Sequence, residues 1–293
     1  MRLAALAPAK VNLCLFLGPV REDGRHELVT LFESVSLADE LIVDTDADRD
    51  EVVCQGVDDP NLVSAALEGL RSRGWDGPRV HVEIAKRIPV AAGMGGGSAD
   101  AAAVLRLACE LAPGRPEEVA ALAASLGADV PSQLVPGLVL GSGAGDIVEP
   151  FPPLSEHAFV IVPQPVPLST ADVYREADRL GLPRGGDELA RLHQELLAAL
   201  RPSARLDSRY SINDLSAAAV SACPEIADAL TAVGGAGAET VLVCGSGPTV
   251  AGVLWGTDAA ARASTAAESL GPDFRGATHA VPVGAEFGLP RVA

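Results

Sequence analysis

The feature that most constrains the fold is a run of glycines between a predicted strand and a predicted helix. Val80, Val82 and Ile84 alternate with polar residues, as in a β-strand, whereas apolar residues recur at helical spacing over 98–112. Residues 89–98 between them read PVAAGMGGGS. Glycines let the backbone approach an anion, and the N-terminus of a helix stabilises negative charge. The run therefore predicts a phosphate-binding loop; a flexible turn before a capped helix is the structural alternative.

Two common nucleotide-binding patterns do not match this loop. The chain contains no GxxxxGK[ST] segment, and it has no GxGxxG followed by an acidic ribose-binding residue. Lys86 lies three residues before Pro89 and adds positive charge, and Ser98 could cap the helix or contact a phosphate. These neighbours favour phosphate binding by a loop of a different class.

Composition limits the partners of such a site. The formal net charge of −17 argues against binding to nucleic acid or to an anionic membrane, because both need a basic face. The chain carries twenty arginines but only two lysines, Lys10 and Lys86. A lysine is a compact charge that a planar arginine does not replace, so both positions are candidates for specific chemistry. Two chance surface lysines are the alternative.

Cysteine and histidine spacing predicts neither a disulfide framework nor a zinc site. The five cysteines form no CxxC pair and the five histidines lie far apart, which fits a reducing compartment. No apolar stretch approaches the roughly 18 residues of a membrane span. The apolar run at 3–9 is short and is followed by Lys10, unlike a signal peptide. A cytoplasmic protein without membrane or nucleic-acid partners is expected.

An alternating segment at 9–17 predicts a strand near the start of the chain. In a regular strand Lys10 and Asn12 share one face, and Leu13, Leu15 and Leu17 share the other.

Strands and helices mix along the whole chain, which predicts an α+β fold. The region 127–150 is rich in glycine and proline and predicts loops and short strands, and 150–153 is a plausible boundary between domains 1–152 and 153–293. Further strands are expected at 40–45, 158–162, 240–244 and 249–254, and helices at 61–73, 116–126, 170–180, 186–200, 214–222, 224–233 and 258–270.

Six segments, in order, carry a family resemblance. Three of them, PAKVNL at 8–13, GMGGGS at 93–98 and GSGPT at 245–249, resemble the GHMP kinases. Three more are similar to the 4-diphosphocytidyl-2-C-methyl-D-erythritol kinases within that superfamily: DGRHEL at 23–28, LGADVP at 126–131 and NDL at 213–215. The resemblance implies a two-domain GHMP kinase fold, with an N-terminal domain like ribosomal protein S5 domain 2 and a ferredoxin-like C-terminal domain. The active site would lie between them.

The resemblance also implies an activity. ATP would donate its γ-phosphoryl group, with Mg²⁺ present, to the 2-hydroxyl of 4-(cytidine 5′-diphospho)-2-C-methyl-D-erythritol in non-mevalonate isoprenoid precursor biosynthesis. No magnesium ligands are identified, and the protein would be a monomer or a homodimer. The alternatives are another GHMP kinase, of the homoserine or mevalonate type, and a non-catalytic ligand sensor. Segments 23–28 and 127–131 argue against the first, and Lys10 with Asp129 against the second.

Two residues match the family's catalytic pair. Asp129 would orient the acceptor hydroxyl and take its proton, and a turn cap before Pro131 is the alternative. Lys10 would offset negative charge that develops on the reacting oxygens. A solvated charge on a strand is the alternative for Lys10.

The resemblance assigns the nucleotide to the glycine loop and to positions near the adenine. Asn61 is one of the latter and could instead cap a helix. The expected nucleotide-binding residues are Asn61, Lys86, Pro89, Gly93, Met94, Gly95, Gly96, Gly97 and Ser98.

The acceptor substrate is assigned to Asn12, Arg25, His26, Gly245, Ser246 and Gly247. His26 falls where the family reads cytosine, and an imidazole has both a donor and an acceptor for a pyrimidine edge. Arg25 stands where the family usually has tyrosine, and its guanidinium plane could stack on the base or pair with the diphosphate. Structural roles are the alternatives for Asn12 and His26, and a simple hairpin turn for 245–249. Asn213-Asp214 is expected to cap a helix.

Overall fold

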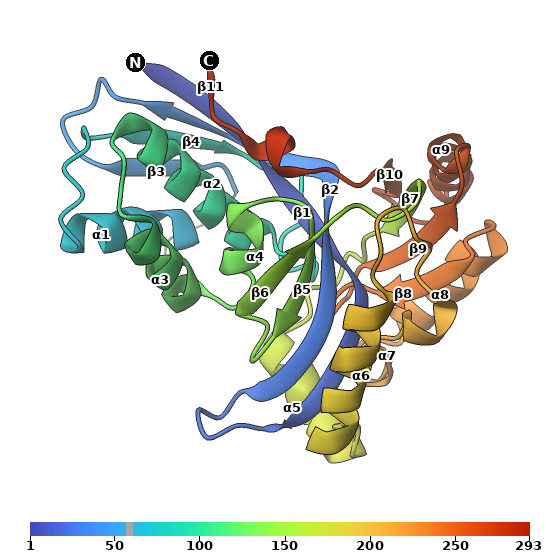
Figure 1. Cartoon of the computed structure of the whole chain (residues 1–293). Helices are drawn as coiled ribbons and strands as arrows, with labels where there is room; N and C mark the ends of the chain where they lie inside the picture. The colour runs from blue at the N-terminus through green and yellow to red at the C-terminus, as the bar shows by residue number, and fades with distance from the viewer. Residues whose placement is uncertain (57–60) are drawn as a thin grey trace.

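The computed structural model describes residues 1–56 and 61–293, which form two β-sheets (Figure 1). The first sheet has the order β11-β1-β2-β4-β3, with β5 pairing to β2 and β6 to β5. Its strands are β1 (Arg2–Val20), β2 (His26–Asp44), β3 (Glu51–Cys54), β4 (His81–Ala85), β5 (Leu138–Ser142), β6 (Ile147–Phe151) and β11 (Arg291–Val292). The second, antiparallel sheet has the order β10-β7-β9-β8. Its strands are β7 (His157–Val162), β8 (Thr240–Val243), β9 (Val250–Trp255) and β10 (Thr278–Ala280).

Each sheet is accompanied by its own group of helices, which confirms the α+β class (Figure 1). The first group is α1 (Leu62–Ser72), α2 (Gly96–Leu111), α3 (Pro116–Leu126) and α4 (Val130–Leu134). The second group is α5 (Thr170–Leu180), α7 (Ser216–Ala222), α8 (Glu225–Gly235) and α9 (Ala259–Leu270). Helix α6 (Gly186–Ala199) packs against β1 and β2. The short helix α4 was not predicted, because its five residues lie in a segment whose prolines and glycines indicated loops. No helix of the described residues is long and apolar enough to cross a membrane.

The strands β1 and β2 are far longer than predicted and form one antiparallel hairpin that runs through the molecule (Figure 1). The register of this hairpin shifts after Asn12. An extra residue in one strand moves every following side chain to the opposite face. Leu15 therefore joins Lys10 and Asn12 along the same cavity, and Leu15 and Leu17 pack into the core of the second sheet. The predicted grouping of Leu15 and Leu17 with Leu13 was wrong.

The two halves of the chain are joined by pairing and by a buried ion pair. Strand β11 returns to pair with β1, so both termini lie at the same end of the molecule (Figure 1). Between β2 and β7, His157 Nε2 lies 2.7 Å from Glu33 Oε2, and His157 Nδ1 donates to the Ser155 carbonyl at 2.7 Å. Both side chains are buried. The division into 1–152 and 153–293 stays a prediction; it falls in the connection between β6 and β7.

Candidate active site

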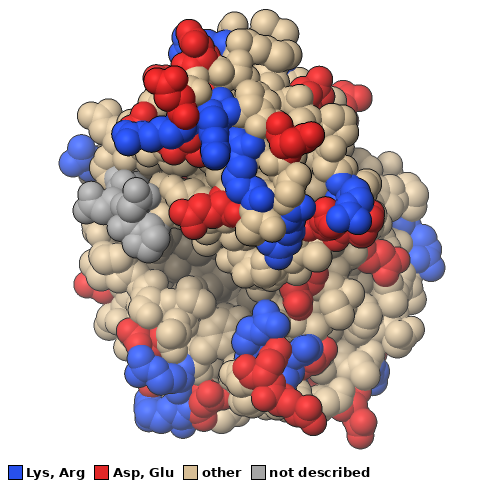
Figure 2. Space-filling model, turned by 90° about the vertical axis from the view of Figure 1, so that its left-hand side faces the viewer, with Lys and Arg blue, Asp and Glu red and all other residues tan. Residues whose placement is uncertain are grey.

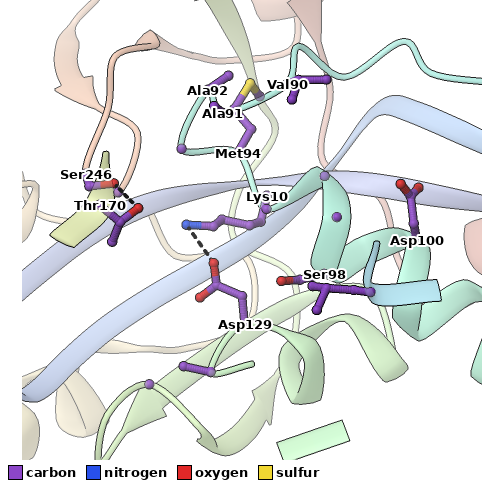
Figure 3. A pocket seen from close by; sticks show the side chains of 18 of the residues that line it. Lys10, Val90, Ala91, Ala92, Met94, Ser98, Asp100, Asp129, Thr170 and Ser246 are labelled. Atoms are coloured by element: carbon purple, nitrogen blue, oxygen red, sulfur yellow. Dashed lines mark hydrogen bonds and ion pairs between the residues drawn. The ribbon is translucent and has the colours of Figure 1, made fainter. Parts of the chain in front are cut away.

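A cavity of about 470 Å³ contains most of the predicted site residues. A hollow is visible on the face shown in Figure 2, with acidic and basic side chains intermixed around it, and Figure 3 shows the cavity from close by. The predicted residues that line the cavity are Lys10, Asn12, Asn61, Lys86, Pro89, Gly93, Met94, Gly95, Gly96, Gly97, Ser98, Asp129, Gly245 and Ser246. Arg25, His26 and Gly247 lie outside this lining.

Lys10 on β1 and Asp129 before α4 form an ion pair inside the cavity (Figure 3). Lys10 Nζ lies 3.5 Å from Asp129 Oδ2, and the lysine side chain is 4% exposed whereas the aspartate is 33% exposed. The ammonium also donates to Asn12 Oδ1 at 2.7 Å, and Asn12 Nδ2 donates to Thr30 Oγ1 at 2.8 Å. This chain of hydrogen bonds orients Lys10. Asn12 therefore makes the structural side-chain bond that was the alternative to substrate binding, and it also lines the cavity.

The Asp129 carboxylate makes no capping hydrogen bond to α4 within the described part of the chain, although Asp129 occupies the N-cap position. The side chain points towards Lys10 instead (Figure 3). A partly exposed carboxylate beside a fixed ammonium is placed to accept a proton from a bound hydroxyl group. The turn-cap alternative is therefore not supported by the geometry.

The glycine loop leads into the N-terminus of α2. Gly95 is the N-cap residue, with φ +70°, and no described side chain caps this end of the helix, so Ser98 does not act as the cap. The first N–H groups of a helix have no partner within the helix and stabilise an anion. Lys10 N donates to the Met94 carbonyl at 3.0 Å, which ties the loop to β1 next to the reacting pair.

Lys86 is engaged by two acidic side chains that sequence analysis did not assign to the site. Its Nζ lies 2.5 Å from Asp39 Oδ2 and 2.8 Å from Asp100 Oδ2. Burial, followed by the negative charge of Asp39, raises the pKa of Asp100 to about 7 against the opposing effect of Lys86. Burial alone would lower the pKa of Lys86, but the two carboxylates outweigh it and raise that pKa. These partners are far apart in sequence, so no local pattern could reveal them.

Asn61 caps a helix and also lies in the cavity wall. It lines the cavity, and its Oδ1 accepts a hydrogen bond from Ser64 N at 2.9 Å as the N-cap of α1. The cap is therefore confirmed, and contact with a nucleotide stays a prediction.

The segment 244–249 contributes Gly245 and Ser246 to the cavity lining and packs directly against Gly93 of the glycine loop. Gly245 has φ +54°, and a Cβ there would lie 3.2 Å from Lys10 Nζ. Ser246 Oγ lies 3.0 Å from Thr170 Oγ1 on α5 (Figure 3). Asn213 Nδ2 donates to the carbonyls of Val243 and Gly245 at 2.8 and 2.6 Å. The expected helix cap was wrong, because Leu215 is the N-cap residue of α7 and no side chain caps it within the described part of the chain. Asn213 instead holds segment 244–249 in place.

The predicted cytosine readers lie beside the cavity. Arg25 is in the β1–β2 turn, and its Nη2 lies 3.0 Å from Asp23 Oδ2 and 3.8 Å from Asp146 Oδ2. His26 Nδ1 lies 3.0 Å from the Gly18 carbonyl, and its ring centroid is 5.5 Å from that of Tyr174.

Tyr174 and Thr170 on α5 line the cavity and were missed by sequence analysis. Burial, followed by the charge of Asp129, raises the pKa of Tyr174, so its phenol stays protonated. A helix that contributes one ring and one hydroxyl to a cavity has no distinctive local pattern, so neither residue could be identified from its neighbours in the sequence.

A resident metal centre does not fit these residues. Across 1–56 and 61–293 no group of three or more histidine, cysteine, aspartate or glutamate side chains could hold a metal ion. Magnesium often binds through one or two carboxylates together with substrate phosphates and waters. The accessible Asp129 carboxylate beside the glycine loop fits magnesium that arrives with a nucleotide.

Comparison with known proteins agrees with this geometry. The family model for the N-terminal domain of GHMP kinases matches residues 61–137. The 4-diphosphocytidyl-2-C-methyl-D-erythritol kinase of Streptomyces coelicolor is 41% identical, over 86% of this chain and 87% of that protein. The enzyme of the same name from Cutibacterium acnes is 38% identical, over 92% and 91%.

Solved structures separate the family from the wider fold. A crystal structure of 4-(cytidine 5′-diphospho)-2C-methyl-D-erythritol kinase has a TM-score of 0.72 and 34% identity, covering 96% of this chain and 99% of that one. Homoserine kinase from Cytophaga hutchinsonii has a TM-score of 0.70 but 18% identity, covering 100% and 97%, and shows the fold alone. By sequence identity and coverage, this chain belongs to the 4-diphosphocytidyl-2-C-methyl-D-erythritol kinase family of the GHMP kinases.

Proposed function

We propose that this protein transfers the γ-phosphoryl group of ATP to the 2-hydroxyl of 4-(cytidine 5′-diphospho)-2-C-methyl-D-erythritol, a step of non-mevalonate isoprenoid precursor biosynthesis. The observation that carries the proposal is the Lys10–Asp129 pair at 3.5 Å, in one cavity with the uncapped N-terminus of α2. An acceptor hydroxyl and a triphosphate would meet there. We further expect the protein to be located in the cytoplasm and to be a monomer or a homodimer.

Three features of the cavity have a defined part in this chemistry. Asp129 orients the acceptor hydroxyl and takes its proton as the oxygen–phosphorus bond forms. Lys10 stabilises the negative charge shared between the attacking oxygen and the transferred group. The N–H groups of the loop and of α2 hold the phosphates that remain with ADP.

Magnesium would offset the charge of the triphosphate when it is bound. Asp129 is the cavity carboxylate with solvent access beside the glycine loop, and it would face an ion carried by the nucleotide. Positive charge for the phosphates would otherwise come from Lys10 and from backbone N–H groups.

The cytidine end of the substrate is assigned to the β1–β2 hairpin and α5. The Tyr174 ring lines the cavity 5.5 Å from the His26 ring, and such rings offer a flat apolar surface to a base. Arg25 remains our candidate for contact with the base or the diphosphate; its exposed guanidinium would have to leave Asp23 to make that contact.

The test is magnesium-dependent release of ADP with the cytidine compound, run in parallel with mevalonate, homoserine and galactose. We expect release with the cytidine compound alone. Release with a different acceptor would retain the kinase and overturn the substrate, whereas no release with any of the four would favour a ligand sensor on the same fold.

A further inference from the structure

Three charged side chains connect the two ends of the glycine loop. Lys86 lies between the end of β4 and the loop, and Asp100 lies in α2 just after the loop. Lys86 Nζ donates to Asp100 Oδ2 at 2.8 Å and to Asp39 Oδ2, on β2, at 2.5 Å. The chain that enters the loop is therefore bonded both to the helix that leaves it and to the sheet beneath it.

Asp39 also holds the backbone at the entrance to the loop. Its Oδ1 accepts hydrogen bonds from Arg87 N at 2.5 Å and from Ile88 N at 2.8 Å, directly before Pro89. The Asp39 side chain is 0% exposed. A buried carboxylate that accepts two backbone N–H groups and a lysine is fixed in position and fixes the residues it contacts.

The charge of this cluster does not suit direct phosphate binding by Lys86. Two carboxylates share one ammonium, and Asp100 Oδ1 is buried without a hydrogen-bond partner among the described residues. The cluster thus adds no net positive charge to the cavity. Figure 3 shows Asp100 on the α2 side, away from the Lys10–Asp129 pair.

The space at the cluster explains why position 86 is a lysine in a chain with twenty arginines and only one other lysine. A Cβ on Gly96 would lie 3.3 Å from Lys86 Nζ, so the ammonium packs closely against the first residue of α2. A planar guanidinium is larger and directs its donors in a fork, whereas an ammonium is compact and reaches acceptors in several directions. The geometry therefore selects a lysine here.

We propose that Asp39, Lys86 and Asp100 are positioning residues for the kinase reaction: they clamp the two ends of the glycine loop together and so set where its N–H groups and those of α2 meet the phosphates of ATP. The clamp acts on ATP through the backbone, and it rests on the proposed function. The family resemblance assigned Lys86 to direct contact with the nucleotide. In this proposal Lys86 instead positions the glycine loop that contacts the nucleotide.

The test compares steady-state kinetics of Lys86→Met, Asp100→Ala and the double variant with those of the wild type. Loss of the charged hydrogen bonds of the clamp should raise the KM for ATP about tenfold, with a smaller change in kcat and an unchanged KM for the acceptor. Because Lys86→Met already removes the bond to Asp100, the double variant should be no worse than Lys86→Met alone. Asp100→Asn keeps an acceptor for Lys86 and should recover part of the loss.

A matched control separates positioning from general stability. Asp50 accepts hydrogen bonds from Arg71, Arg79 and Val80 N, is 18% exposed, and lies outside the cavity. Asp50→Asn should lower stability and leave the KM for ATP unchanged. An unchanged KM in Lys86→Met, additive effects in the double variant, or equal losses of kcat and of both KM values would overturn the clamp.

A second readout does not depend on turnover. Hydrogen exchange of the Arg87 and Ile88 amides, measured without nucleotide, should speed up in Asp39→Ala, and calorimetric titration should show about tenfold weaker ATP binding in Lys86→Met. If the wild type releases no ADP with any acceptor, the proposed function fails. The amide exchange and the ATP titration then still test whether the clamp positions the loop. Unchanged exchange and unchanged ATP affinity would overturn it.

Discussion

Replacing Gly93 by alanine should disrupt the contact between the glycine loop and segment 244–249. Gly93 has φ +74°, which costs an alanine roughly 1 kcal/mol. The new Cβ would lie 2.2 Å from the Cys244 carbonyl oxygen and 2.7 Å from that of Gly247. Both atoms belong to backbone, so relief requires the two segments to separate by about 1 Å, and such overpacking costs about 1–3 kcal/mol. The free energy of unfolding should therefore fall by about 2–4 kcal/mol.

The same displacement should be visible in catalysis. A shift of about 1 Å in groups that position the substrate lowers turnover by about 100-fold, and we expect kcat/KM of Gly93→Ala to fall by that order. Stability is measured by urea unfolding and kcat/KM by coupled ADP release. Gly97→Ala is the steric control for stability, because its Cβ would meet nothing closer than Leu62 Cδ1 at 3.8 Å. Wild-type stability and kcat/KM in Gly93→Ala would refute the reasoning.

Three further outcomes are expected. Asp129→Asn should lower kcat by about 10³-fold, because it removes the proton acceptor, while ATP titration shows near-normal affinity; wild-type turnover would exclude Asp129 as the base. Asn213→Ala should cost about 2 kcal/mol in urea unfolding and lower kcat, since two buried carbonyls lose their donor and Gly245 is released; an unchanged kcat would contradict its positioning role. The stability of the wild type should fall as pH rises above the ordinary histidine pKa of 6.5, because His157 loses its proton, and Glu33→Gln should flatten that slope; equal slopes would contradict it.

The sign of this pH dependence follows from the surroundings of His157. Burial alone would lower the pKa of His157, but the hydrogen bond and the charge of Glu33 outweigh it and raise that pKa above 6.5. A group whose pKa is higher in the folded state contributes its full stability below the unfolded value, and loses it as pH rises through the folded value. Urea unfolding between pH 6 and pH 9 measures this loss.

Local patterns in the sequence predicted the elements that carry the site. The alternation at 80–84, the glycines at 93–97 and the helical spacing after them predicted β4, the loop and α2, since each depends on neighbours along the chain. The ordered motifs identified the family and the α+β fold, which the comparisons confirm. Residue roles that came with the family resemblance, such as those of Arg25 and His26, stay predictions.

Contacts between distant elements were beyond such patterns. The register shift after Asn12 places Leu15 on the opposite face from the one predicted. The shift could not be predicted, because residues 13–17 are apolar on both faces and show no sign of an additional residue in the strand. Asn213 was expected to cap a helix, and its hydrogen bonds to Val243 and Gly245 form only when the segment before α7 packs beside the end of β8.

The sequence by itself determined the family, the strand, loop and helix at 80–112, and the residue types available for phosphoryl transfer, because these depend on spacing along one chain. Only the tertiary structure decided that Lys10 meets Asp129, and that Lys86 is shared between Asp39 and Asp100. The physical reason is that ion pairs and hydrogen bonds act over a few ångströms. The sheet and helix packing that brings such partners within reach is set by the whole core, and no single segment contains that information.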